Sequence, residues 1–209
     1  MSDPQNQFLI VVGVDIEGYS KKSVNQQYRA QQKLESWIVT ASNAAEILAT
    51  DGELRWIDSG DGGFLLFETF YDKAFPFLTK LYREINEHNL ESRPDSTINV
   101  RSAIHCDDSL RWEGQLGPRY AGNALVTCAR ILDSMNREYS NQVVCSGYYI
   151  DKAFASRKTA EERRLPDHVD KHGFIHQVWN LRRANEFGVQ PEDKDLHEKP
   201  TEWYWNPSS

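Results

Sequence analysis

Two aspartates could bring a pair of carboxylates to one site. One follows a segment typical of a strand, and the other lies in the turn between two such segments. Asp15 ends the apolar run 8–14, which has the length and composition of a strand buried inside a sheet. Asp61 lies in the Gly-Asp-Gly-Gly segment 60–63, where glycine supplies the positive φ that a tight hairpin turn needs. Carboxylates at neighbouring strand ends repel each other unless cations lie between them, and such hard oxygen ligands suit Mg²⁺ or Mn²⁺. The simpler interpretation of Asp61 is a turn residue without chemistry, because Asp-Gly is a common turn dipeptide.

Hydrophobic periodicity predicts the elements that would hold these aspartates. Ser23 and Gln26 have the spacing of a capping box, and apolar residues recur at helical spacing from Val24 to Leu48. After the hairpin centred on Asp61, we expect a helix from about 69 or 72 to 88 and a half-buried strand at 98–104. The segment 106–121 is expected to be rich in loops, with at most a short strand at 112–116. The remaining expected elements are a helix at 123–135, a strand at 142–146, a short helix at 147–155, a solvated charged segment at 156–168 and a last strand at 174–181. The order βαββαβ, then a helix and one or two strands, predicts an α+β fold with helices on one face of an antiparallel sheet.

Length and composition limit the classes of protein that fit. The 209 residues, 39% hydrophobic and 11% aromatic, have the composition of one folded domain. A formal net charge of −7 and a pI of about 5.4 argue against binding to nucleic acid or to an anionic membrane surface. The apolar run 8–14 is too short for membrane insertion and lacks the flanks of a signal peptide. The three cysteines (Cys106, Cys128 and Cys145) lack metal-ligand spacing, so we expect reduced thiols and a cytoplasmic location.

Four motifs in fixed order resemble those of the class III nucleotidyl cyclases. Residues 15–20, Asp-Ile-Glu-Gly-Tyr-Ser, resemble the first metal motif of that family, and residues 59–64, Ser-Gly-Asp-Gly-Gly-Phe, resemble the second. Residues 101–105 are similar to the strand that follows in the family, and residues 122–130 are similar to the helix that carries the catalytic arginine. Four motifs in family order are more specific than any one of them.

The resemblance covers residues 8–181 and implies a ferredoxin-like βαββαβ core with additional C-terminal strands and a helix. The flanking segments would be a flexible N-terminus at 1–7 and a C-terminal tail at 182–209, whose cluster Trp203-Tyr204-Trp205 would dock a partner or pack back on the domain. In the family, the metal aspartates and the arginine of one site come from different subunits. A chain with one copy of each motif is therefore expected to form a homodimer with two composite sites.

Class III cyclases convert a nucleoside triphosphate to its 3′,5′-cyclic monophosphate and pyrophosphate. The resemblance implies that Asp15, Asp61 and the backbone carbonyl of Ile16 bind two divalent ions, Mn²⁺ or Mg²⁺. It also implies that Arg130 braces the α-phosphate in the transition state, where a planar guanidinium can donate two hydrogen bonds. Further nucleotide contacts are expected from the turn Glu17, Gly18, Tyr19 and Ser20, which would open a helix toward the β- and γ-phosphates, and from Lys171 before the last strand. Without the motif, Arg130 and Lys171 would be interpreted as surface charges.

One family position is changed. An asparagine that orients the ribose lies four residues before the arginine in the family, and this chain has Val126 there. Either the ribose is held differently, or Asn123 or another group replaces the asparagine, or the activity is low.

The expected base pocket lacks both groups that read purines in the family. Ile57 stands where purine-specific members have a lysine, and Arg119 stands where they have an aspartate or a comparable polar residue. An arginine offers only donors, so it would pair with O4 of uracil and oppose the amino group of cytosine. This favours UTP over CTP. The altered pocket resembles that of the bacterial antiphage pyrimidine cyclases (Pycsar), which implies cyclic UMP or cyclic CMP as a messenger for a separate effector protein. The alternatives are an adenylate or guanylate cyclase with a diverged pocket, and a pseudocyclase that binds nucleotide without turnover.

Overall fold

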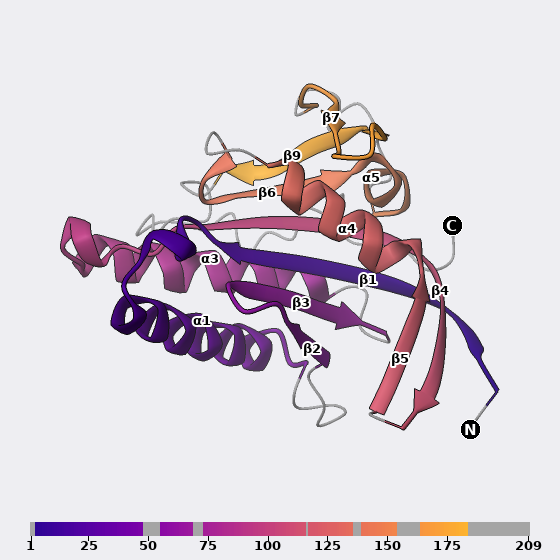
Figure 1. Cartoon of the computed structure of the whole chain (residues 1–209), viewed down its shortest axis with the longest axis horizontal. Coiled ribbons are helices and arrows are strands. Elements are labelled where there is room, and N and C mark those ends of the chain that lie inside the picture. Colours follow the sequence, from indigo (N-terminus) through magenta and orange to yellow (C-terminus); the bar gives the residue numbers. More distant parts are fainter. Residues whose placement is uncertain are drawn as a thin grey trace.

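In this computed structural model, the structure describes residues 3–47, 55–68, 73–115, 117–135, 139–153 and 164–183, with side chains described as far as 180. A central mixed sheet has the strand order β2-β3-β1-β4-β6-β9, with β5 paired to β4 (Figure 1). Its strands are β1 (Gln5–Ile16), β2 (Arg55–Asp58), β3 (Gly62–Phe67), β4 (Val100–Gly114), β5 (Gly117–Gly122), β6 (Gln142–Ser146) and β9 (Val178–Arg183). A second, two-stranded sheet pairs β7 (His168–Val169) with β8 (Ile175–His176). The helices are α1 (Val24–Ala44), α3 (Ala74–Glu91), α4 (Asn123–Ser134) and α5 (Gly147–Ala153), with 3₁₀ turns at η1 (Tyr19–Lys21) and η3 (Pro94–Ser96).

The first part of the chain has the expected βαββαβ order. β1 pairs antiparallel with β3 and β4, and β2 pairs antiparallel with β3, which is the ferredoxin-like arrangement. The Ser23–Gln26 capping box is confirmed at the start of α1, because the Ser23 side chain accepts from the Gln26 N–H and the Gln26 side chain accepts from the Ser23 N–H. Residues 48, 69–72, 154–163 and the tail from 184 on, with its aromatic cluster, lie outside the described residues.

Helices cover both faces of the sheet, so the expectation of helices on one face was wrong. Alternate residues of β1 separate two cores: Ile10, Val12 and Val14 pack with α1 and α3, whereas Leu9 and Val11 pack with α4. Figure 1 shows α4 on the opposite side of the sheet from α1 and α3. A continuous apolar run such as 8–14 is typical of a strand that is buried on both faces, and β1 is such a strand.

The sheet is mixed rather than antiparallel. The β4–β6 pair is parallel, with Ala103 opposite Val144, whereas β6 and β9 are antiparallel. A parallel pair needs a crossover connection, and α4 lies in the segment between β5 and β6.

Two expectations about loops were also wrong. The segment 106–121 is mostly strand, because β4 continues to Gly114 and pairs with β5 across a turn in which Gly117 has φ +95°. β1 begins at Gln5, within the segment expected to be frayed, and Gln5 pairs with Arg111. Both stretches are polar and partly exposed, so they lack the apolar alternation from which strands are predicted. In the described part of the chain, no helix is both long and apolar enough to cross a membrane.

Candidate active site

The structure brings Asp15 and Asp61 together at one edge of the sheet. Asp15 pairs with Gly62 in the β1–β3 register, and the backbone N–H of Ile16 donates to the carbonyl of Asp61 at 2.8 Å. By strand alternation, Asp15 lies on the same face of β1 as Leu9 and Val11, which is the face that α4 covers.

Two glycines allow this close approach. A Cβ at Gly62 would lie 1.9 Å from the carbonyl oxygen of Val14, and a Cβ at Gly63 would lie 2.4 Å from the carbonyl oxygen of Ile57. Any side chain at either position would therefore push β3 away from its neighbours. Gly60 has φ +93°, which explains the glycine before Asp61 in the turn. A cavity of about 340 Å³ beside this turn lies on the α1 side of the sheet. Its lining residues include Gln31, Leu34, Trp56, Asp58 and Gly60, and neither Asp15 nor Asp61 is among them.

Arg101 contacts the Asp15 carboxylate and was not identified as a site residue from the sequence. Its Nε donates to Asp15 Oδ2 at 3.0 Å, its Nη2 donates to the same oxygen, and its Nη1 donates to the carbonyl of Met135 after α4. Burial raises the pKa of Asp15, the Arg101 guanidinium opposes the rise, and the neighbouring Asp61 carboxylate adds to it, so the net shift is upward. Arg101 thus balances one of two carboxylates that still repel each other.

The oxygen atoms around Asp15 and Asp61 are suitable ligands for a hard divalent cation. Two adjacent carboxylates and nearby backbone carbonyls are ligands that Mg²⁺ and Mn²⁺ accept. Within the described ranges, no group of three or more His, Cys, Asp or Glu side chains could hold a metal ion. An ion held by Asp15 and Asp61 would complete its coordination with carbonyl, water or phosphate oxygens.

The turn after β1 differs from the expected helix start. Gly18 has φ +66°, residues 19–21 form only the single 3₁₀ turn η1, and α1 begins at Val24. The backbone N–H of Glu17 donates to the carbonyl of Asn99 at 2.9 Å, so that group is not available for a phosphate. The Glu17 side chain accepts a hydrogen bond from Ser140. The remaining expected phosphate contacts of Gly18, Tyr19 and Ser20 stay predictions.

Arg130 lies on α4 and contacts Asp170 and Phe174 in the turn between β7 and β8 rather than Asp15 or Asp61. Its Nε is 3.4 Å from Asp170 Oδ2, and its guanidinium carbon lies 5.0 Å from the centroid of the Phe174 ring. No hydrogen bond or ion pair joins Arg130 to Asp15 or Asp61 within the described part of one chain.

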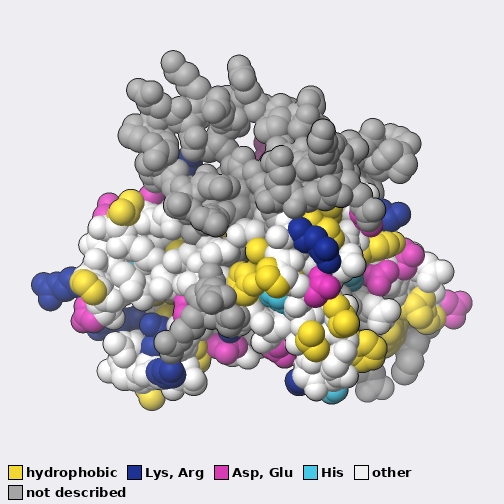
Figure 2. Space-filling model, turned by 90° about the horizontal axis from the view of Figure 1, so that it is seen from above, with side chains coloured by type: hydrophobic (Ala, Val, Ile, Leu, Met, Phe, Trp, Pro, Cys, Tyr) yellow, Lys and Arg dark blue, Asp and Glu magenta, His cyan; other side chains and the backbone are white. Residues whose placement is uncertain are grey.

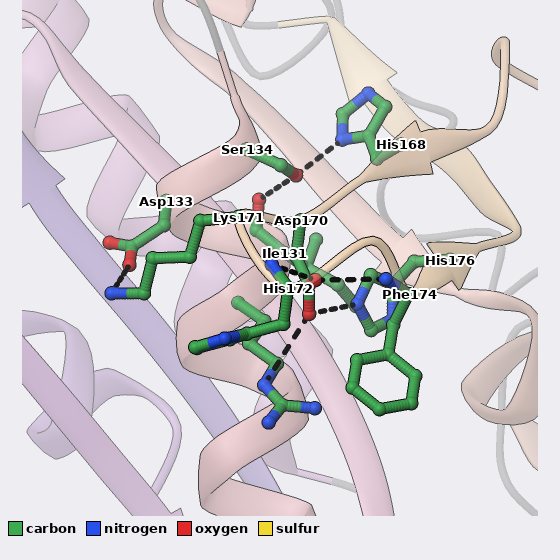
Figure 3. A network of polar contacts seen from close by, with 10 residues as sticks. Ile131, Asp133, Ser134, His168, Asp170, Lys171, His172, Phe174 and His176 are labelled. Carbon is green, nitrogen blue, oxygen red and sulfur yellow. Dashed lines mark hydrogen bonds and ion pairs between the residues drawn. The ribbon is translucent and has the colours of Figure 1, made fainter.

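Among the described residues, no hydrogen bond or ion pair joins the other expected nucleotide contacts to Asp15 or Asp61. Asn123 and Val126 are exposed on α4, and spacings of seven and four residues place both on the side of the helix that bears Arg130. Lys171 is 73% exposed, and its Nζ lies 3.8 Å from Asp133 Oδ2 (Figure 3).

The two expected base-reading positions lie on separate elements. Ile57 is on the edge strand β2 opposite Phe64 and is 37% exposed. Arg119 is exposed on β5 opposite Trp112. A single chain therefore presents the expected site residues in two groups. The first group is Asp15, Asp61 and Ile57, at the end of the sheet where β1, β2 and β3 meet. The second group is Arg130, Asn123 and Lys171 around α4, and Arg119 lies on β5 just before that helix.

The fold is that of the class III nucleotidyl cyclase domains. The chain is similar to the guanylyl cyclase Cya2, with 10% identity over 98% of this chain and 100% of that one and a TM-score of 0.64. It is similar to the guanylate cyclase domain of RhGC from Catenaria anguillulae in complex with GTP (15% identity, 86% and 99% coverage, TM-score 0.59). It is also similar to the adenylyl cyclase CyaB from P. aeruginosa (14% identity, 86% and 95% coverage, TM-score 0.57). No protein-family model and no curated protein matches the sequence.

Proposed function

We propose that the protein is a nucleotide cyclase that converts a pyrimidine nucleoside triphosphate, UTP in preference to CTP, to its 3′,5′-cyclic monophosphate and pyrophosphate. The observation that carries the proposal is the juxtaposition of Asp15 and Asp61 at adjacent strand ends of a class III cyclase fold. A cyclic pyrimidine nucleotide made in the cytoplasm would act on a separate effector protein in antiphage defence.

The proposed mechanism divides the work among few residues. Asp15 and Asp61 would hold two divalent ions, Mn²⁺ or Mg²⁺, with the carbonyl of Ile16. When bound, these ions supply a more acidic ribose 3′-hydroxyl and a fixed triphosphate. Arg130 would donate to the α-phosphate as negative charge develops during attack by the 3′-oxygen. Lys171 and residues 18–20 of the turn after β1 would contact the distal phosphates, and Asn123 would contact the ribose in place of the family asparagine.

A homodimer would unite the two groups of residues in two composite sites. This is supported by the separation of Arg130 from the aspartates in one chain and by exposed apolar side chains around it. Val126 on α4 is 45% exposed, and Val169 and Ile175 in the β7–β8 sheet are 60% and 67% exposed. Figure 2 shows the molecule from above and has apolar side chains in several groups among charged ones. Apolar groups beside charges are typical of a surface that another chain covers.

The test is a nucleotide panel. Purified protein with Mn²⁺ is incubated with ATP, GTP, CTP or UTP, and the products are resolved by chromatography and mass. We expect cyclic UMP as the main product, no product from Asp61→Ala, and wild-type product from the matched control Asp95→Ala on η3. A cyclic purine product would keep the mechanism and contradict the pyrimidine assignment.

A nucleotide-binding pseudocyclase is the second candidate. It is favoured by Val126, which offers no amide to the ribose at the helix position where the family has one. A correctly folded protein that binds nucleotide and forms no product with any of the four would establish it.

A further inference from the structure

The Asp170 carboxylate is the centre of a buried polar cluster beneath Arg130. Its side chain is only 2% exposed. Oδ1 accepts from the backbone N–H groups of His172 at 2.8 Å and Phe174 at 3.0 Å, while Oδ2 lies 3.2 Å from His176 Nε2 and 3.4 Å from Arg130 Nε. Figure 3 shows Asp170 with His172, Phe174 and His176 around it, and the dashed contacts meet at the Asp170 carboxylate. Every partner is a donor, which is the environment of an ionised carboxylate.

The same contacts keep Asp170 charged. Burial by itself would raise the pKa of Asp170, but the hydrogen bonds from His176 and from the backbone N–H groups outweigh burial and lower the pKa to about 2. A fixed negative charge therefore faces Arg130 at neutral pH. A buried anion held by this many donors is a defined anchor for a cation.

The guanidinium of Arg130 has two neighbours, the Asp170 carboxylate and the Phe174 ring. Nε faces Asp170, and the guanidinium carbon lies over the Phe174 ring, 5.0 Å from its centroid. In the described part of the chain, its Nη1 and Nη2 atoms make no hydrogen bond or ion pair. Those two nitrogens are the ones that bind a phosphate or carboxylate in bidentate geometry.

We propose that Asp170 is the positioning residue for Arg130: together with the Phe174 ring, it orients the guanidinium so that its Nη edge is presented to the α-phosphate of the nucleotide. This inference rests on the proposed function. It assigns a role to Asp170, whose neighbour Lys171 in the same turn between β7 and β8 would contact the distal phosphates.

Asp170→Asn tests the proposal, with Asp167→Asn as the matched control. Asp167 lies in the same segment and pairs with the exposed Arg164 at 2.7 Å instead of with Arg130. We expect Asp170→Asn to lower kcat by roughly 10- to 100-fold, the range in which misplacement of a catalytic group acts, with KM within twofold of wild type. Asp167→Asn should leave both constants unchanged, and Asp170→Glu should recover part of kcat.

A double-mutant comparison separates positioning from a general structural effect. In an Arg130→Ala background, adding Asp170→Asn should cause no further loss of kcat, because its effect acts through the arginine. Phe174→Leu removes the ring and keeps the backbone donors to Asp170, so it gives a second measurement if Asp170→Asn fails to fold. It should lower kcat with KM unchanged.

Three results would overturn the positioning role. They are an unchanged kcat in Asp170→Asn with active wild-type protein, an equal loss in the Arg130→Ala background, and an increased kcat, which would make Asp170 a restraint on the arginine. If the wild-type protein itself turns over no nucleotide, the proposed function fails, and the positioning role fails with it.

Discussion

Asp15 has a cation, Arg101, and an anion, Asp61, as neighbours, and only the contact with Asp61 was predicted from the sequence. Its partner Arg101 is 86 residues away in the chain and entered the sequence analysis only as part of a strand motif. Asp61 could be predicted, because a hairpin turn and an apolar strand are both local patterns. Positions fixed by local backbone geometry were therefore accessible from sequence, whereas side-chain partners between distant strands were not.

Arg119 gives the first prediction at the residue scale. If its guanidinium donates to O4 of uracil, Arg119→Ala should reduce the ratio of kcat/KM for UTP over CTP by roughly threefold to tenfold, the value of one hydrogen bond of about 1 kcal/mol. Steady-state rates with each nucleotide measure this ratio. Arg29→Ala, which removes an exposed arginine on α1, is the control and should keep the wild-type ratio. Unchanged selectivity in Arg119→Ala would contradict the pocket assignment.

Asp170 shows why part of the candidate site was missed. In the sequence it is one acid in the polar stretch Asp170-Lys171-His172-Gly173, and only Lys171 was assigned a role there. Its burial depends on α4 packing beside the β7–β8 sheet, which no periodic pattern in 164–176 indicates. The anchoring carboxylate becomes visible only from the tertiary contact.

At the scale of elements, β4 connects the separate parts of the domain. It pairs with β1 on one side, with β6 on the other and with β5 at its far end. The sequence predicted only its apolar half, because 107–111 are polar except for Leu110 and form part of an arm with little core contact. Apolar alternation predicts strands over a core, and it gives no signal where a hairpin extends into solvent.

His105 on β4 gives a prediction about stability. It is 5% exposed, and its Nδ1 lies 2.7 Å from Ser146 Oγ on β6. Burial lowers the pKa of His105 to about 4, which His176 reinforces and Asp107 opposes. The unfolded chain, with a histidine pKa near 6.5, then binds more protons than the folded one, so the protein should lose stability as the pH falls from about 6.5 to 4.

The measurement is denaturant unfolding between pH 7.5 and 4.5. Fully developed, the His105 contribution to the free energy of unfolding is roughly 3 kcal/mol. His168, whose pKa is also lowered by burial, acts in the same direction. His105→Gln should flatten the decline of the unfolding midpoint with falling pH. A slope equal to that of wild type would show that His105 is protonated within the fold.

At the scale of the whole molecule, the composite-site proposal makes a quantitative prediction. Asp61→Ala should be inactive alone and Arg130→Ala should keep only a small residual kcat, because each removes an essential group from both sites of a homodimer. A mixture of equal amounts, allowed to exchange subunits, should recover about a quarter of wild-type activity, because half of the dimers contain one intact site. A mixture of Asp15→Ala and Asp61→Ala is the control and should stay inactive. No recovery in the first mixture, despite confirmed exchange, would mean that each site lies within one chain.

The turn that holds Asp61 and the exposed margins of the sheet differ greatly in how many substitutions they tolerate. Gly62 is enclosed by backbone, and Gly63 is enclosed by the Ile57 carbonyl and the Trp56 ring, so the carboxylate turn tolerates almost no change. Ile57 and Arg119, by contrast, lie on an edge strand and on an exposed arm, outside both cores. Substitutions there cost the fold little. Under the proposed function, a lineage with this architecture could therefore change which base it reads many times over while inheriting one unaltered pair of metal-binding carboxylates.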